Sequence, residues 1–300
     1  MISETDTPDN AAPEISIIIP AYNEGEGITR VLQSIQNQPS LAGAEIVVVD
    51  DGSTDNTGAV VANFPGVHLV SHRMNKGYGA AISSGVKAST GRYVIWFDAD
   101  WQYRVEDLVR LAQVIVEKDL DWCVGARGSD SYQERERVFG KFLLGLAVRI
   151  VTGRKVPDYN SGLRGYRREV IKRYLHLLPK GFGASTTMTL IMLERGYYGE
   201  DIPIIQRKRI GKSSVKIFRD GIRTLMIILR IFLLFKPLRF FGSVGIIFIL
   251  GGLIYGVPKA IQTRSGFPVL AALTVILGVQ VFFFGLLADQ ISLSRLERFE

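Results

Sequence analysis

Two long runs without a charged residue near the C-terminal end of the chain restrict its fold more than any other feature. They extend over residues 240–258 and 265–288 and are 19 and 24 residues long. A helix needs about 20 apolar residues to cross the roughly 30 Å of hydrocarbon in a bilayer. Gln280 is the only strongly polar side chain in either run, whereas surface helices of soluble domains usually have a polar face. We therefore predict two membrane-spanning helices, with two buried helices of a soluble domain as the alternative.

The segment between these runs is short, so the two helices should form a hairpin that returns the chain to its starting side. Lys236 and Arg239 precede the first run, and Arg295 and Arg298 follow the second. Lys and Arg are enriched in the cytoplasmic loops of membrane proteins. This enrichment predicts cytoplasmic flanks for the hairpin, although the connecting residues 259–264 also carry two positive charges.

The segment before the hairpin is apolar but is interrupted by four basic residues. In a helix with 100° per residue, these four positions lie within about 60° of one another, which gives one basic stripe and a broad apolar face. Such a helix is typical of a membrane interface, and an amphipathic core helix with a solvated edge is the alternative. The basic stripe consists of Lys216, Arg219, Arg223 and Arg230.

The rest of the chain has the composition of a folded soluble domain. Over the whole sequence, 47% of the residues are apolar and 22% are charged, which lies outside the range of disordered chains. The single cysteine, Cys123, excludes an intrachain disulfide, and the three histidines lack the partners of a zinc finger. The N-terminus is polar and acidic and lacks the segments of a cleavable signal. We expect a polar tail (1–14), a cytoplasmic domain (15–214), an interfacial region (215–237), the hairpin (238–291) and a cytoplasmic tail (292–300).

Short apolar runs alternate with segments of helical spacing in the first part of the expected soluble domain. The runs end at loop-forming residues such as Pro20 and Asp50. This rhythm predicts an α/β fold with a mainly parallel sheet and helices on both of its faces. Ligands of such sheets bind at the carboxyl ends of the strands. The predicted strands are residues 15–19, 45–49, 67–70 and 93–97, and the predicted helices are residues 28–35, 55–62, 79–88 and 105–116.

Carboxylates gather at the predicted carboxyl ends of these strands. An acidic edge repels nucleic-acid phosphates, so we expect no nucleic-acid partner despite the net charge of +7. Asp98 and Asp100 follow a predicted strand, and side chains two residues apart point to the same side of a strand. Gln102 continues the alternation and adds a third oxygen. This pattern predicts bound Mg²⁺ or Mn²⁺, with helix or turn capping as the alternative role of the two aspartates.

Five motifs in this order resemble family 2 glycosyltransferases. The resemblance is greatest to the polyprenyl-phosphate glycosyltransferases, the group of dolichol-phosphate mannose synthase and its bacterial undecaprenyl-phosphate relatives. It extends from about Ile15 to Ser214 and more loosely into the hairpin, and it implies a GT-A-type fold. The motifs are Ile18-Ile-Pro-Ala-Tyr-Asn-Glu24, Val48-Val-Asp-Asp-Gly-Ser-Thr-Asp55, Asn75-Lys-Gly-Tyr-Gly79, Asp98-Ala-Asp-Trp-Gln102 and Ser161-Gly-Leu-Arg164.

The resemblance also implies where the nucleotide-sugar donor binds. Asp50 follows a strand and can accept a hydrogen bond from a base, and Tyr22 offers a stacking face. We interpret Asp51, with the two residues after it, as a turn followed by a helix cap. Lys76 lies in a glycine-rich loop, where it either contacts a phosphate or stays solvated. A basic segment at residues 207–212, the late basic segment, is implied to bind the donor pyrophosphate through Arg209 and Lys212. The other implied donor residues are Pro20, Tyr22, Glu24, Asp50, Lys76, Asp98, Ala99 and Asp100.

A second, basic group of residues matches the acceptor-phosphate positions of the family. These residues are Arg127, Ser161 and Arg164, and the forked guanidinium of arginine suits a phosphate well. Solvated surface arginines are the alternative. Asp158 is predicted either to orient an arginine or the sugar, or to cap a loop. We assign the catalytic roles to Asp100, Arg127 and Arg164.

The resemblance implies inverting transfer of a hexose-type sugar from a UDP- or GDP-linked donor to the phosphate of a membrane polyprenol. The expected partners are the nucleotide sugar, the polyprenyl phosphate and the bilayer, and self-association is compatible with this assignment. One alternative is a processive polysaccharide synthase, since Gln206-Arg-Lys-Arg209 is similar to the Gln-x-x-Arg-Trp signature, although position 210 is Ile. The other is a non-catalytic membrane scaffold that binds nucleotide or lipid.

Overall fold

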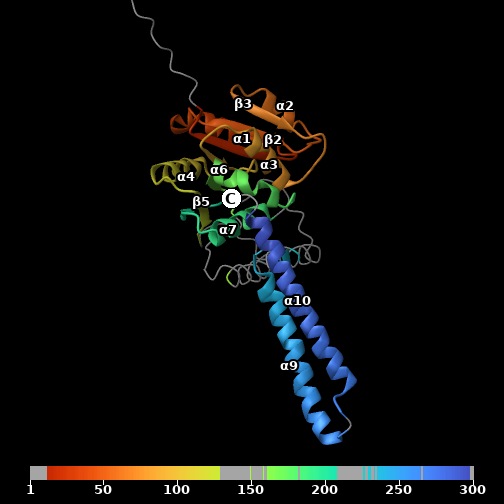
Figure 1. Ribbon diagram of the computed structural model, residues 1–300. Helices are drawn as coiled ribbons and strands as arrows, with labels where there is room; N and C mark the ends of the chain where they lie inside the picture. The colour runs from red at the N-terminus through yellow and green to blue at the C-terminus, as the bar shows by residue number, and fades with distance from the viewer. Residues whose placement is uncertain are drawn as a thin grey trace, which may run out of the picture. The chain divides into compact units, whose positions relative to one another are not determined.

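A computed structural model describes most of the chain (Figure 1). It divides into two compact units, which we describe separately. One unit contains the described residues up to 128 and from 158 to 207, and the other contains two long helices. The described residues are 12–128, 149, 158, 161–181, 183–207, 226, 229, 230, 233, 235–264 and 266–297.

The first unit is built on one seven-stranded sheet with the strand order β3-β2-β1-β4-β6-β5-β7. β1 pairs in parallel with β2 and β4, and β2 pairs in parallel with β3. β6 is antiparallel to both of its neighbours, while β5 and β7 are parallel to each other. The strands are β1 (Ile15–Ala21), β2 (Glu45–Asp50), β3 (Val67–Ser71), β4 (Tyr93–Trp96), β5 (Trp122–Arg127), β6 (Arg164–Arg167) and β7 (Gly199–Ile204).

Helices connect the strands, and each predicted strand and helix of the first 117 residues is confirmed with small shifts at its ends (Figure 1). The remaining part of the domain, from β5 to β7, had no predicted elements. The helices are α1 (Gly25–Gln36), α2 (Thr57–Ala62), α3 (Tyr78–Ala88), α4 (Val105–Glu117), α6 (Arg168–Tyr174) and α7 (Ala184–Glu194), with single 3-10 turns at Pro39–Leu41 and Leu175–Leu177.

The core explains why the strands are apolar along their whole length. Alternate residues of β1, such as Ile17 and Ile19, pack in a cluster with α1 and α4 on one face of the sheet. Ile18 points to the other face, where Gly85 of α3 lies so close that no side chain fits there. All three isoleucines are fully buried. Strands covered on both faces have near-continuous apolar sequences, so the predicted α/β architecture with a mainly parallel sheet is confirmed.

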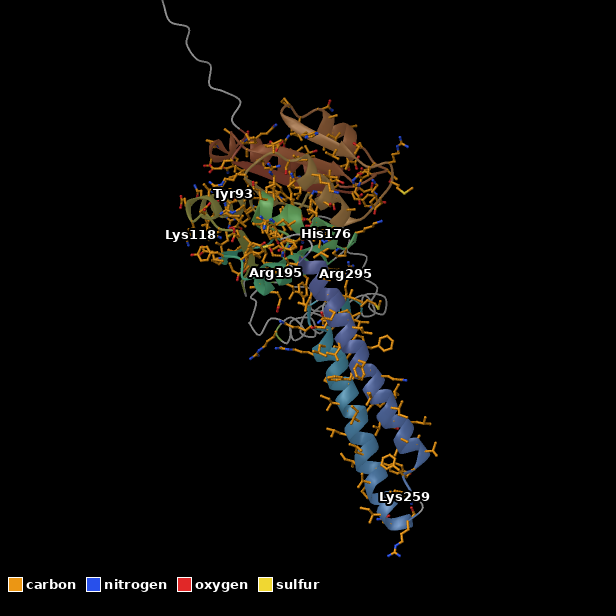
Figure 2. The ribbon with its side chains drawn as sticks, viewed as in Figure 1. Tyr93, Lys118, His176, Arg195, Lys259 and Arg295 are labelled. Carbon is orange, nitrogen blue, oxygen red and sulfur yellow. The ribbon has the colours of Figure 1, made fainter. Side chains whose placement is uncertain are left out.

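The second unit contains α9 (Pro237–Thr263) and α10 (Val269–Glu297), which pack side by side (Figure 1). Lys259 lies near the loop end of this hairpin and Arg295 near its other end (Figure 2). α9 continues through Pro258, where the sequence indicated its end, and α10 begins later than expected because Gly266 adopts φ +87° and a proline follows. Both helices are long and apolar enough to cross a membrane.

Glycines line the contact between α9 and α10. A Cβ on Gly245 would lie 2.7 Å from the carbonyl oxygen of Gly278, and a Cβ on Gly252 would lie 2.7 Å from a methyl group of Val275. Small residues allow helix backbones to approach closely, which is a common way for helices to pack in lipid. The large apolar side chains of the hairpin, such as Ile254, are instead exposed.

Candidate active site

The ends of six strands bring the sequence motifs to one edge of the sheet. β1, β2, β4, β5 and β7 run in the same direction, so their carboxyl ends lie at the same edge. β6 runs in the opposite direction, and its first residue, Arg164, therefore lies at this edge too. The strand order thus explains how motifs more than 100 residues apart meet in one region.

The loops after β1 and β2 bind each other in the region predicted for the donor nucleotide. Ala21 pairs with Asp50 across the two strands. The backbone N–H of Asn23 donates to Ser53 Oγ at 3.0 Å, and the N–H of Thr54 donates to Asn23 Oδ1 at 2.8 Å. Tyr22 is 45% exposed, so its ring can stack on a base. The structure thus brings Pro20, Tyr22, Glu24 and Asp50 together on adjacent strand ends.

Asp51 anchors the glycine-rich loop and does not cap a helix, which corrects its interpretation from the sequence. It is 3% exposed and accepts hydrogen bonds from the backbone N–H groups of Lys76 and Gly77 at 2.9 and 2.7 Å. His72 Nδ1 lies 2.6 Å from Asp51 Oδ1. The turn itself is present, since Gly52 has φ +73° and packs against the backbone of the same loop. The side chain of Lys76 is exposed at this edge.

The predicted metal-binding residues follow β4 directly. Asp98 and Asp100 are both partly buried, and Ala99 between them is buried. Asp98 Oδ1 accepts a hydrogen bond from the hydroxyl of Tyr78 at 3.1 Å, and Asp100 Oδ1 accepts one from the N–H of Gln102 at 3.1 Å. Among the described residues, no three His, Cys, Asp or Glu side chains are grouped to hold a metal ion. The set of two carboxylates and one amide oxygen nevertheless fits Mg²⁺ or Mn²⁺, because both prefer oxygen ligands.

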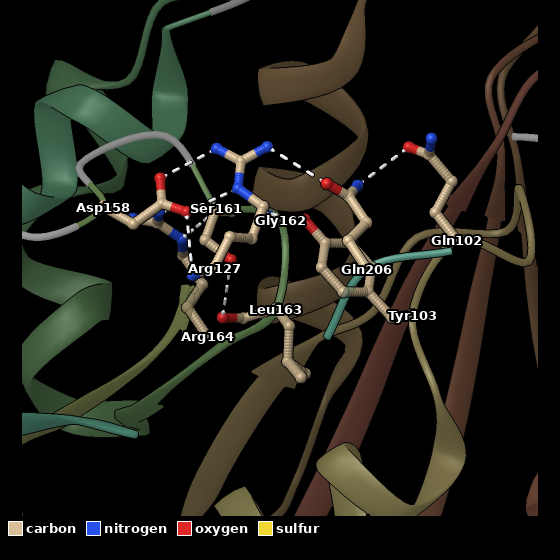
Figure 3. A network of polar contacts seen from close by, with 9 residues as sticks. All are labelled: Gln102, Tyr103, Arg127, Asp158, Ser161, Gly162, Leu163, Arg164 and Gln206. Carbon is tan, nitrogen blue, oxygen red and sulfur yellow. Dashed lines mark hydrogen bonds and ion pairs between the residues drawn. The ribbon is translucent and has the colours of Figure 1, made fainter. Parts of the chain in front are cut away.

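Arg127, at the end of β5, is held by a network of polar contacts (Figure 3). Its Nε and Nη2 donate to the two carboxylate oxygens of Asp158 at 2.5 and 2.8 Å. Its Nη1 donates to Gln206 Oε1 at 3.3 Å, and Gln206 Nε2 donates to Gln102 Oε1 at 3.0 Å. Burial opposes the charge on Arg127, but the hydrogen bonds and charge of Asp158 outweigh this effect and raise the guanidinium pKa. Asp158 therefore orients an arginine, one of the three roles predicted for it.

Arg164, which the sequence assigned to the acceptor phosphate, is enclosed in the domain. Its side chain is fully buried, and its Nε and Nη2 both donate to the carbonyl oxygen of Ser161. Its Nη1 contacts the carbonyl oxygen of Ser185 at 2.7 Å and Thr189 Oγ1 at 3.0 Å. The guanidinium also lies over the ring of Trp96. Because Ser185 and Thr189 belong to α7, the side chain points into the layer between the sheet and α7.

Ser161 is also fully buried, and its hydroxyl contacts the carbonyl oxygen of Leu163 at 3.4 Å. The buried hydroxyl of Tyr103 accepts a hydrogen bond from the N–H of Gly162 at 2.6 Å. Gly162 has no space for a Cβ because Asp98 lies against it. The Ser161–Arg164 motif is therefore packed against Asp98 through Gly162.

Three ionisable groups to which the sequence assigned no role of their own lie in or around these motifs. Burial raises the pKa of Tyr103 to about 12, and the charge of Asp98 adds to this shift. Burial also raises the pKa of Tyr78. Burial and the charge of Asp158 raise the pKa of Asp201 to about 6, while Arg164 opposes the shift. Asp201 and Arg164 pair with the same residue of β5 and so lie on one face of the sheet. No spacing pattern in the sequence indicates these contacts.

Several predicted residues lie outside the described residues. They are Arg209 and Lys212 of the late basic segment, and Lys216, Arg219 and Arg223 of the basic stripe. Arg230, the last residue of the stripe, is described and is exposed.

Comparisons with known families identify both units. Residues 16–175 match the family described as Glycosyl transferase family 2, and residues 236–294 match the family described as GtrB C-terminal hairpin. An undecaprenyl-phosphate 4-deoxy-4-formamido-L-arabinose transferase of Sodalis glossinidius is 28% identical over 296 residues, which cover 93% of this chain and 88% of the relative. The transferase of the same name from Yersinia pestis is 29% identical with the same coverage.

Solved structures show a likeness in fold. Glucosyl-3-phosphoglycerate synthase from Mycobacterium tuberculosis in complex with phosphoglyceric acid has a TM-score of 0.59 and 21% identity, with 74% of this chain and 80% of that chain covered. A complex of the same enzyme with Mn²⁺, uridine diphosphate and glucosyl-3-phosphoglycerate has a TM-score of 0.56 with the same identity and coverage. This likeness, together with the strand order, confirms the GT-A-type sheet.

Proposed function

Because the chain belongs to glycosyl transferase family 2, we propose that it transfers a sugar from a nucleoside-diphosphate sugar to a polyprenyl phosphate in the membrane. The relatives named as undecaprenyl-phosphate transferases and the match to the GtrB C-terminal hairpin support this acceptor class. The hexose suggested by the sequence stays a prediction, since these relatives are named for a derivative of arabinose, a pentose.

One observation carries the proposal. Hydrogen bonds connect Arg127, which is predicted to bind the acceptor phosphate, to the motif that is predicted to bind the donor, and both lie at the same edge of the sheet. Arg127 contacts Gln206, and Gln206 contacts Gln102 of the predicted metal-binding residues 98–102, which we call the metal motif (Figure 3). A transferase must hold the attacking and departing phosphates on either side of the sugar. A scaffold that only binds nucleotide has no need of an ordered arginine beside the donor motif.

The proposed reaction needs no strong general base in the protein. The second pKa of a phosphate monoester is about 6, so the acceptor is mostly a dianion near pH 7. One of its oxygens forms a bond to the anomeric carbon as the bond from that carbon to the nucleoside diphosphate breaks, which inverts the configuration. Arg127 orients the attacking phosphate, and Asp158 holds the guanidinium in place for it.

Asp98, Asp100 and Gln102 would hold Mg²⁺ or Mn²⁺, which when bound supplies positive charge beside the departing diphosphate. The structures of the mycobacterial synthase support this choice, because one of them contains Mn²⁺ together with uridine diphosphate. The chain's own aspartates are kept in place by Tyr78 and by the backbone N–H of Gln102.

We further propose that α9 and α10 span the bilayer, with the catalytic domain and both termini in the cytoplasm. The length and apolar character of both helices support a membrane hairpin. The basic residues that flank the hairpin support a cytoplasmic position of its ends. The bilayer then holds the polyprenol tail, and self-association of the chain stays a prediction.

Transfer of label from a nucleotide sugar into lipid tests the proposal. The full-length chain in detergent is incubated with undecaprenyl phosphate, Mn²⁺ and a panel of radiolabelled UDP- and GDP-sugars, and label is counted in the organic phase. We expect one donor to give a lipid-linked monosaccharide, and Asp100→Asn to lower turnover by at least about 100-fold. Glu117→Gln changes an exposed carboxylate of α4 and should leave turnover unchanged. A polymer as product, or no labelled lipid with any donor, would overturn the proposal.

A further inference from the structure

Gln206 occupies the position between the two substrate regions of the domain. It follows β7 and is 9% exposed. Its side-chain oxygen accepts a hydrogen bond from Arg127 Nη1 at 3.3 Å, and its side-chain nitrogen donates to Gln102 Oε1 at 3.0 Å. Both ends of one buried amide are thus occupied, one by the acceptor-side arginine and the other by the metal motif (Figure 3).

The chemistry of the partners determines which way each amide in this network points. A guanidinium has only N–H donors, so the Gln206 atom facing Arg127 must be the oxygen. The nitrogen of Gln206 then faces Gln102 and must meet an acceptor, which places Gln102 Oε1 toward Gln206. An amide oxygen has two lone pairs, so the second one is the one that would bind the metal ion. The direction of donation therefore runs from Arg127 through Gln206 to Gln102. A flipped amide at either glutamine would place donor against donor.

The residue after Gln206 holds the same loop through its backbone. The N–H of Arg207 donates to the carbonyl oxygen of Gln102 at 2.9 Å, and the Arg207 guanidinium lies 5.3 Å from the ring centre of Trp101. Trp101 has φ +61°, which is uncommon for a bulky side chain and must be maintained by its surroundings. The end of β7 therefore restrains the backbone and the side chain of the metal motif together.

Arg127 uses three of its five N–H groups in side-chain contacts with other described residues. Two of its five N–H groups donate to Asp158 and one donates to Gln206. Its side chain is 19% exposed. A phosphate that binds to the remaining N–H groups would meet an arginine whose position depends on both Asp158 and Gln206.

We infer that Gln206 is a positioning residue that couples the acceptor-binding arginine to the metal-binding glutamine, so that donor and acceptor recognition depend on each other. This inference rests on the proposed function. Gln206 touches neither reacting atom in it and acts through Arg127 and Gln102. Its removal should weaken metal-dependent nucleotide binding and acceptor binding at the same time.

Two substitutions separate the two halves of this role. Gln206→Leu removes both hydrogen bonds. Gln206→Glu keeps an acceptor for Arg127 but can no longer donate to Gln102. The loss of the neutral hydrogen bond between Gln206 and Gln102 corresponds to about a three- to tenfold change in a binding constant, and the bond from the charged Arg127 contributes at least as much. Gln113→Leu, at an exposed position of α4, is the matched control.

Calorimetry of the full-length chain in detergent measures the dissociation constant of UDP, or of GDP in its place if the transfer assay selects a GDP-linked donor, with and without Mn²⁺. Steady-state transfer measures KM for undecaprenyl phosphate. We expect both substitutions to weaken Mn²⁺-dependent UDP binding about three- to tenfold, with UDP binding in EDTA unchanged. Only Gln206→Leu should raise the acceptor KM by a similar factor. Gln113→Leu should match the parent in every measurement.

The inference is overturned if Gln206→Leu lowers the unfolding temperature while its UDP affinity and acceptor KM, measured well below that temperature, equal those of the parent. It is also overturned if Gln206→Glu raises the acceptor KM as much as Gln206→Leu does. If the parent binds UDP with Mn²⁺ but labels no lipid with any sugar donor, the proposed function fails instead, and the calorimetric comparison still tests the contact between Gln206 and Gln102.

Discussion

Replacing Arg164 with methionine tests whether this arginine supports the fold or binds substrate. In the structure the guanidinium is fully buried and donates to the backbone carbonyl oxygens of Ser161 and Ser185. Methionine fills a similar volume but donates no hydrogen bond. The substitution therefore leaves the carbonyl oxygen of Ser161 without its two donors, whereas the carbonyl oxygen of Ser185 keeps the hydrogen bond from Thr189 Oγ1.

The expected loss of stability follows from these contacts. Each buried acceptor left without a partner costs about 1–3 kcal/mol, and part of this cost is offset by the apolar packing of methionine. The lost hydrogen bond from the charged guanidinium to Ser185 adds about 1.5–3 kcal/mol, so we expect a total of about 3–5 kcal/mol. In a domain of roughly 200 residues, 1 kcal/mol shifts the midpoint of thermal unfolding by about 2–4 °C, so we expect a decrease of roughly 6–20 °C.

Thermal unfolding of the full-length protein in detergent, followed by circular dichroism, measures this decrease. Arg173→Met, at an exposed position in the last turn of α6, is the matched control and should change the midpoint by less than about 2 °C. A midpoint within 2 °C of the parent for Arg164→Met, together with weaker acceptor binding, would refute the reasoning. Arg164 would then act on the acceptor phosphate.

Four further predictions concern other parts of the chain. The pKa of Asp201 is raised to about 6 in the folded protein, so ionisation of this carboxyl lowers the free energy of unfolding as the pH rises from about 4 to 6. Asp201→Asn should make that decrease smaller by about 1–2 kcal/mol, as urea unfolding at pH 4 and pH 6 can measure. Gly245→Ala, whose Cβ would meet the facing backbone, should lower the unfolding midpoint in detergent, whereas Gly251→Ala, which has open space, should not. Cys123 is buried and its thiol pKa is raised to about 12, so a maleimide at pH 7.5 should label it only after denaturation, as mass spectrometry can show. If Asp98 and Asp100 hold the metal, excess EDTA should abolish sugar transfer and added Mn²⁺ should restore it; full activity in EDTA would contradict the assignment.

Local patterns in the sequence were sufficient to predict the elements of the first half of the domain and the hairpin. Runs such as residues 45–49 and 93–97 are apolar throughout because strands covered on both faces need no alternation. The uncharged runs at the C-terminal end predicted α9 and α10 because a bilayer-spanning helix must be apolar over about 20 residues. The motif order also indicated the family that the comparisons confirm.

The same patterns did not predict the second half of the domain or the environments of individual polar residues. β6 has only four residues, and α7 is buried all round, so neither shows a clear period. The sequence assigned Arg164 and Arg127 to the same phosphate, yet one is enclosed and the other is partly exposed. Asp51 was interpreted as part of a turn and cap, whereas it anchors a loop more than 20 residues away.

The sequence by itself thus determined the strands and helices of the first 117 residues, the two long apolar helices and the family, because these depend on residues close together in the chain. The tertiary structure alone decided which arginine faces the sheet edge, that Gln206 lies between Arg127 and Gln102, and that Asp51 holds the glycine-rich loop. These contacts join residues 25 to 104 positions apart. They exist because the strand order places the carboxyl ends of β2, β4, β5 and β7 at one edge, and no local pattern specifies that order.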